Sequence, residues 1–360
     1  MRILLIGGGV HPIPPTGYGA IERILTDLRA ALEAAGEEAV VVNRVRHGRM
    51  RDEYPFAWEL PRLLRRERFD VLHAQTPVVA NRLALGGRPY VYTSHSRHWY
   101  YRESLTHRWG YFLERRAVRG ARAAVALTDR LADKMRATVR PPLPPISVIP
   151  FGVDTDRFAP RWDRRTGRRA LGVGVVAPFK RWHLAVAALA GTGVSLTIAG
   201  PIVSDSYAES LRRHGPEVTL AGEVPDSELE RLFGESDFLV HPSAVEILSA
   251  TVLEGLSAGL PVLGGAAVEG VVEDDVTGAV VPDQDPAAFA RGLGERVRVL
   301  VAEDDRRRRV GESARAVALA RYAWPRIVPD LLTVYRSVAA ETADRPARTA
   351  SGRVHAAGAR

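Results

Sequence analysis

Residues 2–9 read RILLIGGG, a short apolar run that is closed by three glycines. Such a run is typical of a buried strand in a parallel sheet. After a proline-rich loop, apolar residues recur at helical spacing from Ile21 to Leu32, and Gly36 ends the predicted helix before the next apolar run at residues 39–42. The start of the chain therefore predicts one strand-helix-strand unit.

The same alternation continues along the rest of the chain. Predicted strands separated by segments of helical length lie near residues 71–74, 90–93, 123–127 and 147–149, and a second series lies near residues 171–176, 195–199, 218–220, 238–240, 261–263 and 279–281. This alternation predicts an α/β protein with two consecutive doubly wound domains. Because doubly wound sheets bind ligands at the carboxyl ends of their strands, we expect the site in the cleft between the domains.

The predicted domain boundaries are residues 1–153 for the first domain and residues 154–323 for the second. A final helix, predicted at residues 324–340, has no strand after it and is expected to pack back on the first domain. Residues 341–360 are rich in Ala, Arg and Gly and predict a disordered tail.

Composition excludes several classes of protein. The 360 residues include no cysteine, which rules out disulfides, thiolate metal sites and a cysteine nucleophile. No apolar run is long enough to span a membrane, so a cytoplasmic protein is expected. The formal charge of +8 suits a polyanionic partner, but arginine clusters such as residues 306–309 are simpler to interpret as solvated helix faces. We therefore expect no nucleic-acid partner, while a weak association with a membrane surface stays open.

The most informative stretch is residues 241–262, HPSAVEILSATVLEGLSAGLPV. A strand runs into a loop, and a helix is predicted to start near Ser249 and to end at Gly259. Glu246 lies in the loop and can reach into the cleft, whereas Glu254 lies within the helix and can accept hydrogen bonds from a diol such as ribose. The free amides of the helix N-terminus between them attract phosphate. On spacing alone, an ordinary amphipathic helix with two solvated glutamates is the simpler interpretation.

This stretch resembles the signature of the family 4 retaining glycosyltransferases: Pro-Ser, two residues, Glu, seven residues, Glu, then small-Ala-Gly-x-Pro-Val. Further segments resemble the family in the same order: residues 15–22 (PTGYGAIE), 70–73 (DVLH), 93–95 (TSH), 148–154 (VIPFGVD), 177–180 (APFK), 199–201 (AGP) and 220–222 (LAG). The similarity spans residue 1 to about residue 340. It implies the GT-B fold, in which two Rossmann-like domains face each other across a cleft.

The resemblance also implies roles for individual residues. Lys180 should bind the diphosphate of a nucleotide-sugar donor, Glu254 the ribose, and Glu246 the hydroxyls of the transferred sugar. A fixed ammonium and a helix dipole can replace Mg²⁺ there, so no metal and no other cofactor are expected. The other predicted donor contacts are Gly17, Gly19, Arg181, Leu248, Ser249, Ala250 and Thr251.

On the acceptor side, His95 resembles the family histidine that lies near the transferred sugar, and we expect a catalytic role for it. A purely structural histidine is the alternative. The neighbouring aromatic loop, His98, Trp99 and Tyr100, is expected either to contact the acceptor or to anchor the loop.

Three positions depart from the family pattern. Val175 stands where an arginine usually binds the diphosphate, Phe151 replaces an asparagine, and Gln75 replaces a second histidine. Because one lysine is a weak counterweight to a diphosphate, we expect Arg181 to supply the missing positive charge, although it could equally face solvent.

The sequence therefore predicts a retaining glycosyltransferase that uses a UDP- or GDP-sugar, with a small-molecule natural product or thiol precursor as acceptor. A lipid- or glycan-linked acceptor in cell-envelope synthesis is an alternative. A sugar-nucleotide epimerase and a catalytically silent nucleotide-sugar-binding relative are further alternatives. A NAD-dependent oxidoreductase is disfavoured because Gly7-Gly8-Gly9 lacks the Gly-x-Gly-x-x-Gly spacing. Which sugar, which acceptor and which oligomeric state apply is left open.

Overall fold

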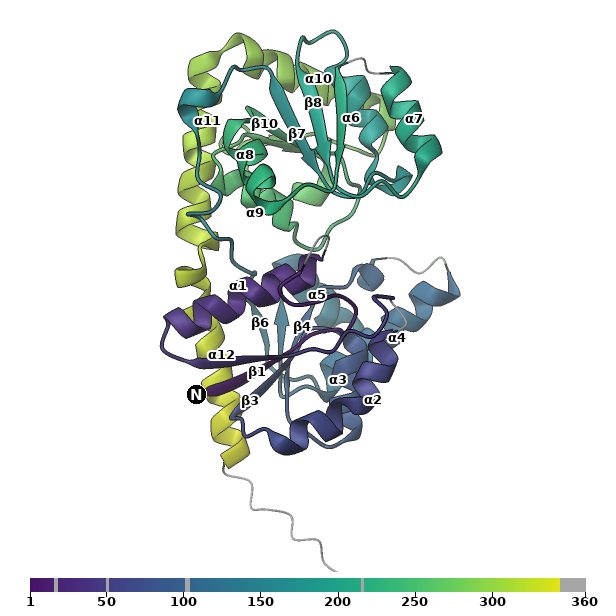
Figure 1. Ribbon diagram of the computed structural model, residues 1–360, viewed down its shortest axis with the longest axis vertical. Helices are drawn as coiled ribbons and strands as arrows, with labels where there is room; N and C mark the ends of the chain where they lie inside the picture. The colour runs from purple at the N-terminus through teal and green to yellow at the C-terminus, as the bar shows by residue number, and fades with distance from the viewer. Residues whose placement is uncertain (16–18, 50–51, 101–103, 215–216, 344–360) are drawn as a thin grey trace, which may run out of the picture.

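Two parallel sheets of six strands each form the framework of the protein (Figure 1). The computed structural model describes residues 1–360 except 16–18, 50–51, 101–103, 215–216 and 344–360, so the predicted tail lies almost entirely outside the described residues. The first sheet contains β1 (Arg2–Ile6), β2 (Glu38–Val42), β3 (Val71–Ala74), β4 (Val91–Ser94), β5 (Ala123–Ala126) and β6 (Ile146–Val148). The second contains β7 (Arg169–Val173), β8 (Ser195–Ala199), β9 (Val218–Gly222), β10 (Phe238–His241), β11 (Val262–Gly264) and β12 (Gly278–Val280).

Helices connect the strands of each sheet. In the first half these are α1 (Ala20–Ala34), α2 (Glu53–Leu63), α3 (Pro77–Leu85), α4 (Leu105–Gly120) and α5 (Asp129–Thr138). In the second half they are α6 (Trp182–Leu189), α7 (Asp205–His214), α8 (Asp226–Glu235) and α9 (Ala250–Ser257), while α10 (Pro286–Ala302) and α11 (Asp304–Val317) follow the last strand, β12. The strands are apolar and fully buried where helices cover both faces, as Ile3 to Ile6 in β1 show with no exposed surface.

The strand order fixes where each sheet can bind a ligand. The first sheet has the order β2-β1-β3-β4-β5-β6, which reverses direction between β1 and β3. The second has the order β12-β11-β10-β7-β8-β9, which reverses between β7 and β10. A crevice opens at the carboxyl ends of the two strands that flank such a reversal. The loops after β7 and β10 are those that carry Lys180 and Glu246.

The last helix, α12 (Trp324–Ala343), leaves the second half and lies along the first (Figure 1). Its Tyr335 is fully buried, and the hydroxyl lies 2.7 Å from Nδ1 of His73 in β3. Next to the start of α12, the amide of Val153 donates to the carbonyl of Tyr322 at 2.8 Å. The two segments that join the halves thus run side by side.

Most predicted strands lie within a residue or two of the observed ones, but β7 differs. It covers Arg169–Val173, whereas the apolar run predicted residues 171–176. The strand ends early because Gly174 adopts a φ of 146° and the indole of Trp182 donates to the Val175 carbonyl at 2.9 Å. Because β7 ends at Val173, the residues after it leave the sheet and form the loop that leads to Lys180.

Candidate active site

A cavity of about 370 Å³ lies between the two halves, at the reversal point of the second sheet. Its lining combines the start of α1, the loops after β7, β8 and β10, and the first turns of α8 and α9. Glycine is required where the loops after β7 and β8 meet. A Cβ at Gly200 would lie 2.2 Å from the carbonyl oxygen of Gly174, and both glycines line the cavity.

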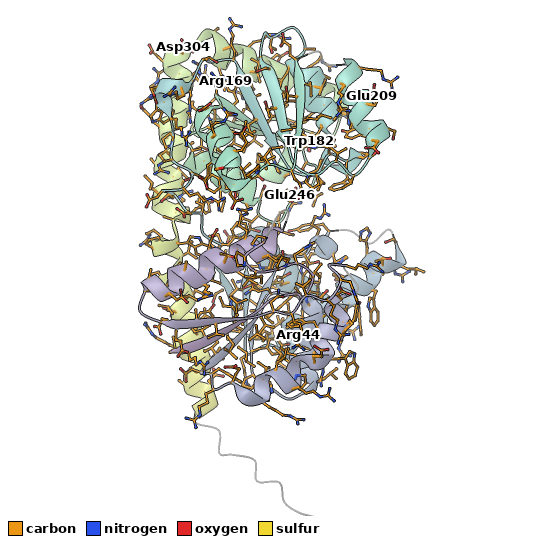
Figure 2. The ribbon with its side chains drawn as sticks, in the orientation of Figure 1. Arg44, Arg169, Trp182, Glu209, Glu246 and Asp304 are labelled. Carbon is orange, nitrogen blue, oxygen red and sulfur yellow. The ribbon has the colours of Figure 1, made fainter. Side chains whose placement is uncertain are left out.

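Lys180 and Glu246 meet in this cavity. Lys180 Nζ donates to Glu246 Oε1 at 2.6 Å, and each side chain is 14% exposed. Burial alone would raise the pKa of Glu246, but the nearby imidazole of His241 and the Lys180 ammonium outweigh it and lower the pKa. Figure 2 shows Glu246 at the gap between the halves. The pair therefore holds one positive and one negative charge side by side.

Helix α9 begins at the cavity wall. Ser249 is its N-cap residue but its side chain makes no capping hydrogen bond, so the first amides of the helix are not satisfied by the cap. All four of the predicted contacts in this turn line the cavity: Leu248, Ser249, Ala250 and Thr251. The wall thus presents the positive end of a helix beside the Lys180–Glu246 pair.

Glu254 lines the cavity one turn further along α9 and is 8% exposed. Burial raises its pKa to about 7, against the lowering effect of Arg23 and Arg157. Asp27 of α1 lies near the same charges, and burial raises its pKa to about 6. Glu254 is therefore a buried acceptor whose charge changes near neutral pH.

A bidentate ion pair crosses the cleft beside Glu254. Arg23 of α1 donates to both carboxylate oxygens of Asp226 in α8, at 3.0 and 2.9 Å. Arg157 adds a contact of 2.9 Å to the same carboxylate. Arg23 and Asp226 also line the cavity, although neither was predicted from the sequence. Only a pattern of charges on α1 and α8 could have suggested them, and their distance in the sequence conceals it.

Arg181 does not occupy the place predicted for it. Its guanidinium donates to Asp283 at 2.7 Å and to the carbonyl of Pro242 at 2.7 Å, and it lies over the ring of Phe289. Arg181 is not among the described residues that line the cavity. Asp283, which follows the edge strand β12, already satisfies the charge of Arg181. The structure thus gives Arg181 a structural role in place of the predicted phosphate contact.

His95 lies next to the main cavity, not in its lining. It borders a separate small cavity of about 20 Å³, and burial lowers its pKa to about 4. Its Nε2 lies 2.8 Å from Oε1 of Gln75, and its ring stacks on Phe151 at 6.4 Å between centroids. Two of the three departures from the family pattern therefore contact this histidine. Phe151 lines both this small cavity and the main one.

The described residues of the aromatic loop after His95 lie outside the lining of the main cavity. Trp99 is fully buried and donates from Nε1 to Ser94 Oγ at 2.9 Å, which makes it the loop anchor. His98 lies beside His107, with ring centroids 5.7 Å apart, and Tyr100 lies beneath Arg130. None of the three lines the main cavity as described. The acceptor role predicted for Trp99 is wrong because its indole fills the core.

The remaining predicted positions divide in two. Gly19 lines the cavity just before α1, whereas Gly17 lies outside the described residues. Val175 is not part of the described lining, so its replacement of an arginine leaves Lys180 and Arg23 as the cations that line this cavity among the described residues.

No group of three or more His, Asp or Glu side chains in the described ranges could hold a metal ion.

Two family descriptions match consecutive parts of the chain. Residues 21–157 match Glycosyltransferase Family 4, and residues 174–298 match Glycosyl transferases group 1. The chain is 31% identical to the 2-deoxystreptamine N-acetyl-D-glucosaminyltransferase of Streptomyces fradiae over 76% of its own length and 68% of that protein. It is 29% identical to the D-inositol 3-phosphate glycosyltransferase of Corynebacterium urealyticum over 56% of its own length, and it spans only 53% of that relative.

Solved structures share the fold along nearly the whole chain. Sucrose-phosphate synthase from Thermosynechococcus elongatus superposes with a TM-score of 0.81, 19% identity and coverage of 94% of this chain and 99% of that one. Anabaena HepE in complex with UDP and glucose superposes with a TM-score of 0.71, 19% identity and coverage of 94% and 100%. These two structures are GT-B glycosyltransferases, so the two-sheet architecture is the GT-B fold.

Proposed function

The chain belongs to the group 1 glycosyltransferases of family 4, and we propose that it transfers a sugar from a nucleotide-sugar donor to an acceptor in the cleft. One observation carries the proposal. Lys180, Glu246 and the N-terminus of α9 converge in one cavity at the reversal point of the second sheet. That set of groups matches the charges of a nucleoside diphosphate sugar.

The diphosphate is the part of the donor that needs positive charge. In the proposed complex it accepts hydrogen bonds from the first amides of α9 and from the Lys180 ammonium. As the bond between the sugar and the diphosphate breaks, negative charge grows on the leaving phosphate oxygen. A fixed ammonium and helix dipole stabilise that charge without needing to reorganise, which supports a reaction independent of metal ions.

The two glutamates hold the two ends of the donor. Glu254, buried one turn into α9, accepts hydrogen bonds from the ribose hydroxyls. Glu246, held by Lys180, accepts hydrogen bonds from hydroxyls of the transferred sugar. The donor thereby replaces the contact between Lys180 and Glu246: its diphosphate binds Lys180 and its sugar binds Glu246. We propose retention of the anomeric configuration on the strength of the family resemblance.

The names of two relatives support a small cyclic polyol as acceptor. D-inositol 3-phosphate and 2-deoxystreptamine are both six-membered carbocycles that carry hydroxyl or amino groups. UDP is the first nucleotide to test because the HepE structures contain it. A lipid- or glycan-linked acceptor, donor epimerisation and donor binding without transfer remain the competing outcomes.

A thermal-shift screen of UDP, GDP, ADP and TDP tests donor binding. A nucleotide present at about 100 times its dissociation constant adds about 2.7 kcal/mol of stability. We expect one nucleotide to stabilise the wild-type protein and to lose most of that effect in Lys180→Ala. The exposed residue Glu295, which lies outside the cavity lining, provides a control as Glu295→Gln.

Product analysis by NMR then separates the activities. A glycosylated acceptor with the donor's anomeric configuration supports the proposal, an epimerised donor supports the epimerase, and an unchanged donor supports a silent binder. Stabilisation by no nucleotide of the four would contradict the donor site itself.

A further inference from the structure

Helix α4 exposes a row of large apolar side chains. Leu105 is 81% exposed, Trp109 53% and Phe112 44%. Their spacing of four and then three residues places them on one face of the helix. The rings of Trp109 and Phe112 stack with centroids 5.4 Å apart. A single exposed apolar residue needs no explanation, but a continuous row of three marks an interaction surface.

The same face carries positive charge and no exposed negative charge. Arg108, Arg116 and Arg119 are exposed and lie within the same arc of the helix. Arg116 lies over the Phe112 ring at 5.7 Å. The carboxylate of α4, Glu114, is fully buried and accepts hydrogen bonds from Tyr92 and Ser94. We call the six exposed side chains, Leu105, Arg108, Trp109, Phe112, Arg116 and Arg119, the α4 face.

The α4 face begins on the cleft side of the first half. Helix α4 follows β4, whose carboxyl end lies at the edge of the sheet that faces the cleft, and a helix after a parallel strand starts from that edge. Asn81, in the middle of α3, donates to the carbonyls of Pro77 and Leu113. The turns of α4 before Leu113 therefore lie level with the start of α3 or beyond it, toward the second half (Figure 1).

We propose that the α4 face docks on the surface of an anionic lipid bilayer. Indole and phenyl rings enter the interfacial zone of a bilayer, while arginine side chains beside them reach the phosphate groups of the lipids. Charge complementarity selects this partner, since every charge on the α4 face is positive. Docking needs no spanning segment, and none of the helices in the described part of the chain is long and apolar enough to cross a membrane.

Docking places the mouth of the cleft near the bilayer. If the proposed sugar transfer holds, this position favours the competing lipid-linked acceptor over a small cyclic polyol, because a lipid-linked acceptor can enter the cleft from the membrane side. The docking itself does not depend on that reaction and can be measured without a donor.

Vesicle sedimentation of the full chain tests the proposal. We expect the protein to sediment with vesicles that contain phosphatidylcholine and phosphatidylglycerol, and about tenfold less with phosphatidylcholine alone. Added salt should weaken the binding because it screens the arginine charges. The double variant Trp109→Ser/Phe112→Ser should lose at least about tenfold in affinity for anionic vesicles. Val203→Ser removes an apolar side chain that is 63% exposed in the second half, and it should bind as the wild type does.

A second pair of changes guards against a folding defect. Arg108→Glu/Arg116→Glu keeps the apolar row and should also abolish binding to anionic vesicles, with an unchanged melting temperature. Wild-type binding by either double variant, or no binding of the wild type to anionic vesicles, would overturn the proposal. A concentration-dependent dimer that Trp109→Ser/Phe112→Ser disrupts, without vesicle binding, would assign the face to a second copy of the chain instead.

Discussion

Glu254 is the residue whose replacement should have the most specific consequences. The side chain is 8% exposed, and burial raises its pKa to about 7 from an ordinary value of 4.5. Above about pH 7 the ionised carboxylate predominates and accepts hydrogen bonds from the proposed ribose diol. Such charge-assisted bonds contribute about 1.5–3 kcal/mol, so Glu254→Gln should weaken nucleotide affinity about 10-fold to 150-fold at about pH 8.

The pH dependence of nucleotide affinity distinguishes a lost hydrogen bond from a distorted binding site. In the wild type, affinity should fall as pH decreases through about 7, because the carboxylate becomes protonated. The glutamine does not titrate, so the difference in affinity between the two proteins should shrink toward about pH 5. Ionisation of the diphosphate changes both proteins alike and cancels in the comparison. Isothermal titration calorimetry with the preferred nucleoside diphosphate measures these constants.

The stability of the nucleotide-free protein should depend on pH in the opposite direction to its nucleotide affinity. A raised carboxyl pKa stabilises the folded state fully below about pH 4.5, and this contribution is lost as pH rises through about 7. This contribution is on the order of a few kcal/mol. Glu254→Gln should therefore become more stable relative to the wild type between about pH 5 and about pH 8, whereas Glu295→Gln should not. Equal nucleotide affinity at all pH values in the wild type and Glu254→Gln would refute the ribose role.

Four further outcomes follow from the cavity. Lys180→Ala should lower kcat/KM at least about 100-fold, because it removes the ammonium that stabilises the leaving diphosphate. A smaller loss in steady-state kinetics would mean that another group supplies the stabilising positive charge. Glu246→Gln should lower kcat about tenfold or more and leave nucleotide affinity unchanged. If calorimetry shows that it loses as much nucleotide affinity as Glu254→Gln, the roles of the two glutamates are interchanged. Arg181→Ala should lower the melting temperature because it leaves Asp283 unpaired, and Asp283→Ala in the same chain should restore part of the loss; wild-type stability of the single variant would argue against this structural role. EDTA should leave turnover unchanged, and activity restored only by Mg²⁺ or Mn²⁺ would disprove metal independence.

The sequence predicted the elements well because both sheets are parallel and buried. Short apolar runs such as residues 195–199 can form little other than an inner strand, and β8 has those bounds. The loop after β10 was also predictable, since Glu246 and Glu254 lie on either side of the start of α9. Local spacing determines both features.

The failures concern side chains whose partners lie far away in the sequence. Arg181 looked free because Asp283 is distant along the chain, although it lies 2.7 Å away in space. For Trp99 the sequence left an acceptor contact and a loop anchor open, and burial of the indole in the core decides for the anchor. Arg23 and Asp226 were not predicted, because they lie 203 residues apart and their charges on α1 and α8 do not by themselves indicate a pair.

A crystal structure of the protein with its preferred nucleoside diphosphate would test the central claim most directly. The diphosphate should lie between Lys180 Nζ and the amides of Ser249 to Thr251, with the ribose hydroxyls within hydrogen-bonding distance of Glu254. The Lys180–Glu246 contact should lengthen as phosphate takes the ammonium. A nucleotide bound elsewhere, or one whose diphosphate contacts neither Lys180 nor the start of α9, would contradict the account.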